Sequence, residues 1–159
     1  MKLDCIRPFN QHDRTPIGEI LRSTHMFTQE EVAVAMELID TFLQNPYQKD
    51  YLLYTAEAQE KAVGYVCYGP TPATEGTFDL YWIAVDPSLQ NSGVGTQLLL
   101  FTEEQIKKAG GRLIIIETSS QEKYQPTRIF YERKGYTLEA RIKDFYRLGD
   151  DRLIYTKRF

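Results

Sequence analysis

Residues 80–99 read LYWIAVDPSLQNSGVGTQLL, an apolar run, a turn with two glycines and a second apolar run with helical spacing. The first backbone N–H groups of a helix are unpaired and carry partial positive charge. Glycines such as Gly93 and Gly95 let the chain adopt unusual dihedral angles, and they let a large anion approach the main chain. The turn therefore predicts a phosphate site formed by the backbone of about residues 91–96.

Other phosphate-binding motifs do not fit this turn. A dinucleotide fingerprint needs a third glycine at position 98, where the chain has Leu98. A P-loop needs Gly-Lys followed by Ser or Thr, and the sequence contains no such run. A tight strand-to-helix turn without a ligand is the alternative interpretation.

The rest of the chain predicts strands and helices arranged around a mixed sheet. Residues 50–57 and 62–69 favour an antiparallel hairpin, and the apolar run 112–118 is typical of a strand buried on both faces. Strand–helix–strand order indicates a parallel pair in an otherwise antiparallel sheet, an α+β or mixed-sheet α/β class. The other expected strands are 3–9, 77–85, 136–148 and 152–159, and the expected helices are 13–23, one starting at Thr28, 96–111 and 126–135.

Two local details accompany these elements. Asp13 is the predicted N-cap of the helix over 13–23. In the helix over 96–111, Glu103 and Lys107 have the spacing of a favourable surface ion pair.

Composition limits the classes of function. The chain has 159 residues, enough for a single domain over 1–159 with a sizeable core. A formal net charge of −3 offers no basic surface for nucleic acid, and no run approaches the roughly 18 apolar residues of a membrane span. The first ten residues lack the apolar segment of a secretory signal, so a cytoplasmic protein is expected. Cys5 and Cys67 have no metal-ligand spacing, so we expect no metal and two reduced, buried thiols.

Val85, Pro87, Gln90, Gly93 and Gly95 all fall in register with one family pattern. The stretch resembles the central motif of the GCN5-related N-acetyltransferases, the GNAT family. That motif is a hydrophobic strand, V-x-P, and then Q/R-x-x-G-x-G/A.

A second family element lies downstream. Residues 126–136, PTRIFYERKGY, resemble the pattern A-x-x-x-Y-x-x-x-G-F/Y. Tyr131, Gly135 and Tyr136 match it, and Thr127 replaces the usual alanine. The resemblance implies a GNAT fold: a mixed central sheet of about six to seven strands with a splayed parallel pair, flanked by about four helices.

The resemblance implies acetyl-CoA as co-substrate, lying in the opening between two splayed strands. Backbone atoms of Ile83, Ala84 and Val85 would bind the pantetheine arm and stabilise the oxyanion of the tetrahedral intermediate. Many relatives have an asparagine seven residues before the motif tyrosine, where this chain has Tyr124. Tyr124 either replaces that asparagine's contact with pantetheine or belongs to a loop that shapes the acceptor pocket. The residues expected to hold the pyrophosphate are Gln90, Asn91, Ser92, Gly93, Val94, Gly95 and Thr96.

Three residues are catalytic candidates by resemblance. Tyr131 occupies the position of the acid, and a neutral phenol with a pKa of about 10 can hydrogen-bond a departing thiolate, whose conjugate thiol has a pKa of about 8.5. The alternative is that Tyr131 only packs on the co-substrate. Asp79 and Glu117 are candidates for the base that takes a proton from the amine, and Glu117 is also a candidate ligand of the acceptor amine. The alternatives are a solvent-facing strand residue for Asp79, and a loop cap or a cation partner for Glu117.

Trp82, Asp144 and Tyr146 are the candidates for binding the acceptor, because family acceptor sites draw on the first two helices and the closing hairpin. Core packing is the alternative for Trp82 and a charged hairpin tip the alternative for Asp144. The expected reaction is direct transfer of the acetyl group in a ternary complex to a primary amine, with a small molecule as the acceptor. An acetyltransferase of protein N-termini or lysines and a catalytically degenerate acyl-CoA sensor are the alternatives. A homodimer through exposed sheet edges is a further expectation.

Overall fold

A seven-stranded sheet forms the centre of the computed structural model, which describes residues 2–159. The strand order is β1-β2-β3-β4-β5-β7-β6, and only β4 and β5 run parallel. This arrangement confirms the predicted mixed sheet with one parallel pair. The strands are β1 Cys5–Pro8, β2 Leu52–Ala58, β3 Lys61–Pro70, β4 Thr77–Val85, β5 Leu113–Ser119, β6 Thr137–Arg147 and β7 Asp150–Arg158. The helices are α1 Arg14–Ser23, α2 Gln29–Gln44, α3 Val94–Lys108 and α4 Gln125–Arg133, with the short 3-10 helices η1 Gln11–Asp13, η2 Pro87–Leu89 and η3 Glu122–Tyr124.

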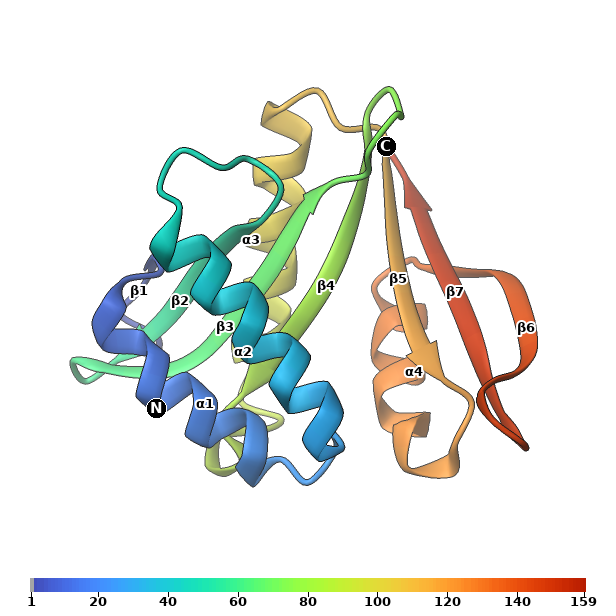
Figure 1. Ribbon diagram of the computed structural model, residues 1–159, viewed down its shortest axis with the longest axis horizontal. Helices are drawn as coiled ribbons and strands as arrows, with labels where there is room; N and C mark the ends of the chain where they lie inside the picture. Colours follow the sequence, from blue (N-terminus) through green and yellow to red (C-terminus); the bar gives the residue numbers. More distant parts are fainter. Residues whose placement is uncertain (1) are drawn as a thin grey trace.

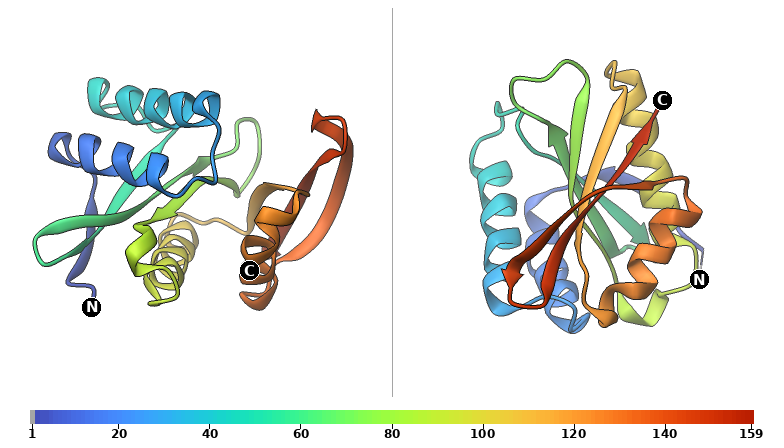
Figure 2. Two further views of the ribbon diagram at one scale, coloured as in Figure 1. Left: turned by 90° about the horizontal axis from the view of Figure 1, so that it is seen from below. Right: turned by 90° about the vertical axis from the view of Figure 1, so that its right-hand side faces the viewer.

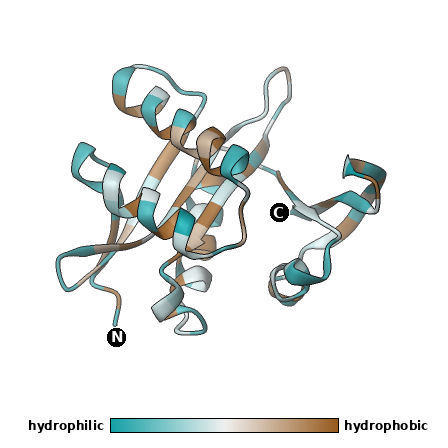
Figure 3. Cartoon of the chain, turned by 60° about the horizontal axis from the view of Figure 1, so that its bottom comes forward, coloured by the Kyte–Doolittle hydropathy of each residue, from teal (hydrophilic) through white to brown (hydrophobic). Residues whose placement is uncertain are grey.

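The helices cover the two faces of the sheet in pairs. Helices α1 and α2 lie on one face, and α3 and α4 lie on the other (Figures 1 and 2). Each face has its own apolar core, and the hydrophobic colours of Figure 3 gather on the strands between these helices. The core under α3 and α4 includes Leu98, Ile106, Ile114, Tyr131 and Tyr155, and the core under α1 and α2 includes Ile17, Leu21, Ile39, Leu53 and Tyr65.

Strand β5 is buried on one face only, so the prediction of burial on both faces was wrong. Ile114 and Ile116 are 0 % and 2 % exposed in the core under α3 and α4. Ile115 is only partly buried, and Glu117 is exposed. The reason is that α1 and α2 pack mainly on β2, β3 and β4.

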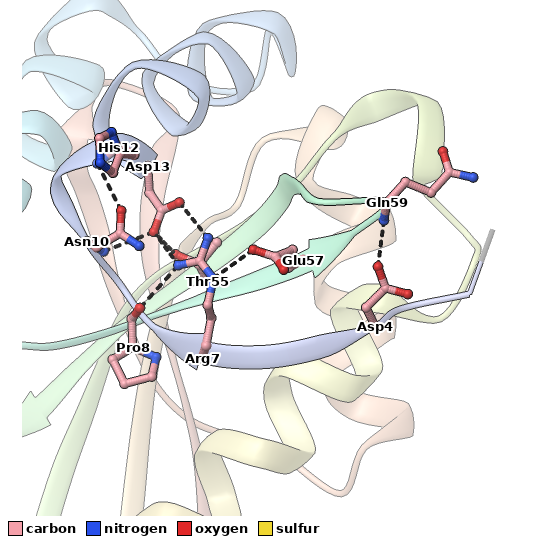
Figure 4. A network of polar contacts seen from close by, with 9 residues as sticks. All are labelled: Asp4, Arg7, Pro8, Asn10, His12, Asp13, Thr55, Glu57 and Gln59. Atoms are coloured by element: carbon pink, nitrogen blue, oxygen red, sulfur yellow. Dashed lines mark hydrogen bonds and ion pairs between the residues drawn. The ribbon is translucent and has the colours of Figure 1, made fainter.

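Asp13 does not cap α1 as the sequence predicted. Its carboxylate instead accepts hydrogen bonds from Arg7 at 2.8 and 2.9 Å, from Thr55 at 2.9 Å and from the backbone of Asn10 at 2.9 Å (Figure 4). Burial of Asp13 acts to raise its pKa, but these hydrogen bonds outweigh it, and the pKa lies below its ordinary value. The network joins β1, η1 and β2 and holds the start of α1 against the sheet.

Glu103 is also placed differently from the expected surface ion pair with Lys107. Its side chain is buried, with 3 % of the residue exposed. It accepts a hydrogen bond from the Tyr136 hydroxyl at 3.0 Å and is bridged by Lys157 at 3.0 Å. These contacts fix α3 to β7 and to Tyr136, the residue that precedes β6.

Strand β6 forms one edge of the sheet and is exposed along its whole length. At the other edge, Cys5 of β1 is exposed, which corrects the expectation that both thiols are buried. Cys67 of β3 is 1 % exposed.

Candidate active site

The parallel strands β4 and β5 separate partway along their length. They are paired only from Thr77 opposite Leu113 to Leu80 opposite Ile116. Tyr81 is the extra residue of a bulge, because Leu80 pairs with Tyr68 of β3 and Trp82 pairs with Cys67. Beyond the bulge, β4 bonds to β3 alone and the two strands diverge, as Figure 1 shows. The edge of β4 at residues 81–85, including Ile83, Ala84 and Val85, therefore presents unpaired backbone groups to the opening.

The turn after β4 brings a helix N-terminus to this opening. Asp86 caps η2 by accepting a hydrogen bond from the Ser88 N–H at 2.9 Å. Asn91 and Gly93 then adopt left-handed conformations, with φ of 63° and 90°, and α3 begins at Val94. Only glycine adopts this conformation without strain, which explains the residue at position 93.

The first N–H groups of α3 are free. Within residues 2–159, the N–H groups of Gly93, Val94, Gly95 and Thr96 donate to no other protein atom. A Cβ at Gly95 would lie 3.8 Å from Val85 Cγ2 and 3.9 Å from Phe130 Cζ, which are ordinary contact distances. The fold itself does not require a glycine at position 95, so close approach of a ligand is the remaining reason for one.

A groove of about 530 Å³ runs from this turn along α4. Two lysine or arginine side chains line it, Arg133 and Lys134, neither of which was singled out from the sequence. They lie between Tyr131 and Gly135 of the second family motif, and that position was the available signal. The other lining residues are Asn91, Thr96, Gln125, Pro126, Ile129 and Phe130. An apolar wall with two cations beside a row of free N–H groups suits a long phosphorylated molecule.

Tyr131 lies in α4, in the core on the α3 side of the sheet. It is 4 % exposed and packs edge-on against Tyr136, with ring centroids 5.8 Å apart. Burial raises the pKa of its phenol well above 10, so the group is neutral at pH 7. Its hydroxyl makes no hydrogen bond to another group of residues 2–159. It is therefore a neutral donor available to a ligand.

Asp79 and Glu117 lie on the opposite face of the sheet from Tyr131. Phe78 and Leu80 point into the core under α3 and α4, so Asp79 between them points to the α1 side. The Asp79 carboxylate accepts a hydrogen bond from Thr71 Oγ1 at 2.6 Å. Burial and the nearby Asp79 charge raise the pKa of Tyr81 to about 12. Glu117 forms an ion pair with Arg152 of β7.

Tyr124 and Trp82 line the α1–α2 side of the opening. The Tyr124 hydroxyl donates to the carbonyl of Met26 at 2.7 Å, and Lys123 donates to the same oxygen at 3.2 Å. Trp82 packs edge-on against Phe27 with ring centroids 5.1 Å apart. The loop between α1 and α2 is thus fastened to η3 across the mouth of the opening. The role of Tyr124 in holding pantetheine stays a prediction, with its hydroxyl committed to Met26.

The closing hairpin contributes Tyr146 and Asp144 in different ways. Tyr146 is 39 % exposed, and its pKa is raised by burial and by the nearby charges of Asp150 and Glu31, so it lies near the start of α2. The Asp144 carboxylate accepts a hydrogen bond from the Gly149 N–H at 2.7 Å. Asp144 therefore stabilises the hairpin tip, the alternative that the sequence left open, while its contact with an acceptor stays a prediction.

Two further observations describe the site. Burial raises the pKa of the Cys67 thiol to about 12, which makes it a poor nucleophile. Residues 2–159 contain no cluster of three or more His, Cys, Asp or Glu that could hold a metal ion, and none of the helices there is long and apolar enough to span a membrane.

Comparison with known proteins supports the same picture. Residues 49–138 match the family model described as the acetyltransferase (GNAT) domain. A GNAT-family structure from Desulfovibrio desulfuricans is 46 % identical, with a TM-score of 0.93 over 97 % of this chain and 98 % of that one. The PaiA N-acetyltransferase of Thermoplasma acidophilum, solved in complex with coenzyme A, shares the fold at 19 % identity, with a TM-score of 0.77 over 100 % of both chains.

One curated relative is the S-(2-succino)cysteine N-acetyltransferase of Bacillus subtilis. It is 33 % identical over 69 residues, 43 % of this chain. The match covers 42 % of that relative, so less than half its length is matched.

Proposed function

The chain belongs to the GNAT acetyltransferase family, and from this premise we propose that it is an acetyl-CoA-dependent N-acetyltransferase. One observation carries the proposal: the free N–H groups from Gly93 to Thr96 lie directly after the unpaired edge of β4. Together they offer a pyrophosphate cradle and a strand edge for a pantetheine arm. The cations Arg133 and Lys134 along the adjoining groove extend the same surface for a phosphorylated molecule.

The residues of the opening suit the chemistry of acyl transfer. A backbone N–H on the free edge of Ile83–Val85 polarises the thioester carbonyl and stabilises the oxyanion that forms on attack. Tyr131, neutral and unbonded, donates a hydrogen bond to the sulfur as the thiolate departs. The high pKa of Cys67 favours direct transfer in a ternary complex over an acetyl-cysteine intermediate.

Of the two carboxylates, Asp79 is the better base. An amine at pH 7 is mostly protonated and must lose a proton before it attacks. The Asp79 carboxylate accepts a hydrogen bond from the Thr71 hydroxyl and lies beside Tyr81, whereas the Glu117 carboxylate is occupied by its ion pair with Arg152. Asp79 and Glu117 both lie on the face opposite Tyr131, so an amine at either carboxylate approaches from the side opposite the departing thiol.

The acceptor in this proposal is the primary amine of a small molecule. Tyr124 and Lys123 fasten the α1–α2 loop across the mouth, which leaves less room for a folded protein substrate. The name of the Bacillus subtilis relative, an N-acetyltransferase of a modified cysteine, points the same way. A cytoplasmic location and a homodimer through the exposed edge of β6 are parts of the proposal that size-exclusion chromatography and cell fractionation can test.

The test is thermal melting of the chain with and without acetyl-CoA, followed by release of free CoA thiol with a panel of amines. A rise in melting temperature together with thiol release supports the proposal. A rise without thiol release for any amine points to a sensor that binds acyl-CoA. No rise at all contradicts the assignment of the turn at Gly93 as a phosphate site.

A further inference from the structure

One face of β5 and β7 is left open to the acceptor side of the cleft. Leu153 and Tyr155 of β7 point into the core under α3 and α4, so Arg152 and Ile154 point the other way. On β5, Glu117 points in the same direction, beside Ile154 in the register of the two strands. Helices α1 and α2 pack mainly on β2, β3 and β4, and on this face Glu117 is exposed while Arg152 and Ile154 are only partly buried. This face, called the cleft floor below, lies beside the opening between β4 and β5, on the side of the sheet opposite Tyr131.

On this floor, an ion pair joins Glu117 of β5 to Arg152 of β7. Arg152 Nη2 contacts the Glu117 carboxylate, and the guanidinium lies 4.7 Å from the centre of the Phe145 ring. Its Nε–H is buried and has no hydrogen-bond partner. A guanidinium has five donors in a fixed plane, and stacking on an aromatic ring orients that plane. Arg152 is therefore an oriented cation with donors still to satisfy, which is the arrangement that recognises a carboxylate.

The pair is weakly held and can be rearranged by a ligand. The Arg152 and Glu117 side chains are 24 % and 36 % exposed. Ion pairs with this much exposure contribute little to stability. A ligand that supplies its own carboxylate to Arg152 and its own ammonium to Glu117 replaces one weak pair with two complementary contacts.

The neighbouring carboxylate of Asp150 is not available to bind a ligand, and acceptors without a carboxylate fit Arg152 less well. Asp150, on the same face of β7, is 2 % exposed and is already bonded to Ser119 and paired with Arg147. An acceptor with a second ammonium group in place of the carboxylate would be repelled by the positive charge of Arg152. A simple amine would leave the free donors of Arg152 unsatisfied.

From this arrangement we infer that the acceptor is an amino acid-type molecule, whose amine and carboxylate are recognised together by Glu117 and Arg152 on the cleft floor. The inference rests on the function proposed above. The aromatic walls at Trp82, Phe27 and Tyr146 suit an apolar or aromatic side chain. Arg152 acts here as a specificity-determining residue.

The first experiment compares amines that differ only in the carboxylate. The pairs are L-phenylalanine with phenethylamine and L-methionine with 3-(methylthio)propylamine. Binding is measured by thermal melting in the presence of saturating CoA, and turnover by thiol release from acetyl-CoA. Within at least one pair, the amino acid is expected to have a kcat/KM about 10- to 100-fold above that of its partner, the range of a charged hydrogen bond.

Variants of Arg152 then test the assignment to a residue. Arg152→Gln is expected to remove the preference, with kcat/KM falling about 10- to 100-fold for the amino acid and little for the simple amine. Arg152→Lys keeps the charge and is expected to restore part of the preference. Arg158→Gln is the matched control, because Arg158 lies on the same strand and pairs with Glu139 at 3.0 Å. Unchanged melting with CoA confirms that each variant is folded.

The outcomes separate this inference from the proposed function. Equal use of both members of every pair, or equal loss for both in Arg152→Gln, overturns the inference and leaves the acetyltransferase proposal standing. Binding of amino acids without any thiol release supports the inference and contradicts the proposed function. If Arg152→Gln does not fold, the comparison of amine pairs on the unmodified chain decides. Absence of amino acid binding in the melting assay also overturns the inference.

Discussion

Replacing Gly95 with alanine is expected to stabilise the protein and to weaken its binding of CoA. The added Cβ would lie 3.8 Å from Val85 and 3.9 Å from Phe130, and φ at this position is not in the left-handed region. The fold therefore accepts alanine without a clash. Alanine in a helix is more stable than glycine by about 0.5–1 kcal/mol. For a chain of this size, that raises the melting temperature by about 1–4 °C.

The same methyl group occupies space beside the free N–H groups of Gly93 to Thr96. A phosphate group bonded to those donors lies within hydrogen-bonding distance of the main chain, so the bound phosphate and the added methyl group compete for the same space. Displacing it is expected to weaken binding about 10-fold or more, equivalent to about 1.4 kcal/mol. Stability and affinity thus move in opposite directions in one variant.

The assay is thermal melting without ligand, followed by calorimetric titration with CoA, on the unmodified chain and on Gly95→Ala. Partial unfolding of the variant cannot explain a loss of CoA affinity, because Gly95→Ala is expected to be more stable than the unmodified chain. Unchanged affinity for CoA would refute the reasoning about the turn. A lower melting temperature in the absence of ligand would refute the reasoning about space at position 95.

Three other outcomes are expected. Tyr131→Phe should lower kcat about 100-fold or more while leaving the affinity for acetyl-CoA nearly unchanged, as measured by steady-state kinetics and titration; equal kcat values would remove its role as acid. Gly93→Ala and Gly149→Ala should each cost about 1–2 kcal/mol in chemical denaturation, because both glycines have left-handed φ, of 90° and 80°, and no atom within 4 Å of an added Cβ. Only Gly93→Ala should also lose CoA affinity, and a similar loss in Gly149→Ala would point to an indirect effect. The lowered pKa of Asp13 contributes stability above its unfolded pKa of about 3.9, and this contribution is lost as pH falls through the lower folded pKa. The stability of Asp13→Asn should therefore depend less on pH over that acidic range, as followed by melting against pH, and an unchanged acid dependence would assign acid unfolding to other groups.

Local patterns in the sequence predicted the elements close to the turn. The positive φ of Gly93 and the start of α3 follow from short-range rules, and the strand–helix–strand order predicted the parallel pair of β4 and β5. The family motif added the opening between those strands. These features depend on residues close together in the chain, which is why one sequence was enough.

Contacts between distant residues could not be predicted in this way. Tyr124 donates to Met26, 98 positions earlier, and Arg152 meets Glu117 across two strands. Glu103 has the spacing of a surface pair with Lys107, yet β7 brings Lys157 to it and buries the carboxylate. Asp13 could serve as a helix cap, but Arg7 and Thr55 compete for its oxygens more effectively. In each case the tertiary structure offered a partner that short-range rules do not include.

The short seam between β4 and β5, only Thr77–Leu80 against Leu113–Ile116, has a consequence for how such a protein can change. Past this seam, the proposed recognition of the co-substrate uses main-chain atoms, which every amino acid possesses. The side chains of Tyr81 and Trp82, which lie on the α1–α2 side, can therefore change to suit a different amine without removing those main-chain groups. Point substitutions in a protein of this architecture can therefore change its acceptor specificity while leaving its binding of the acyl donor unchanged.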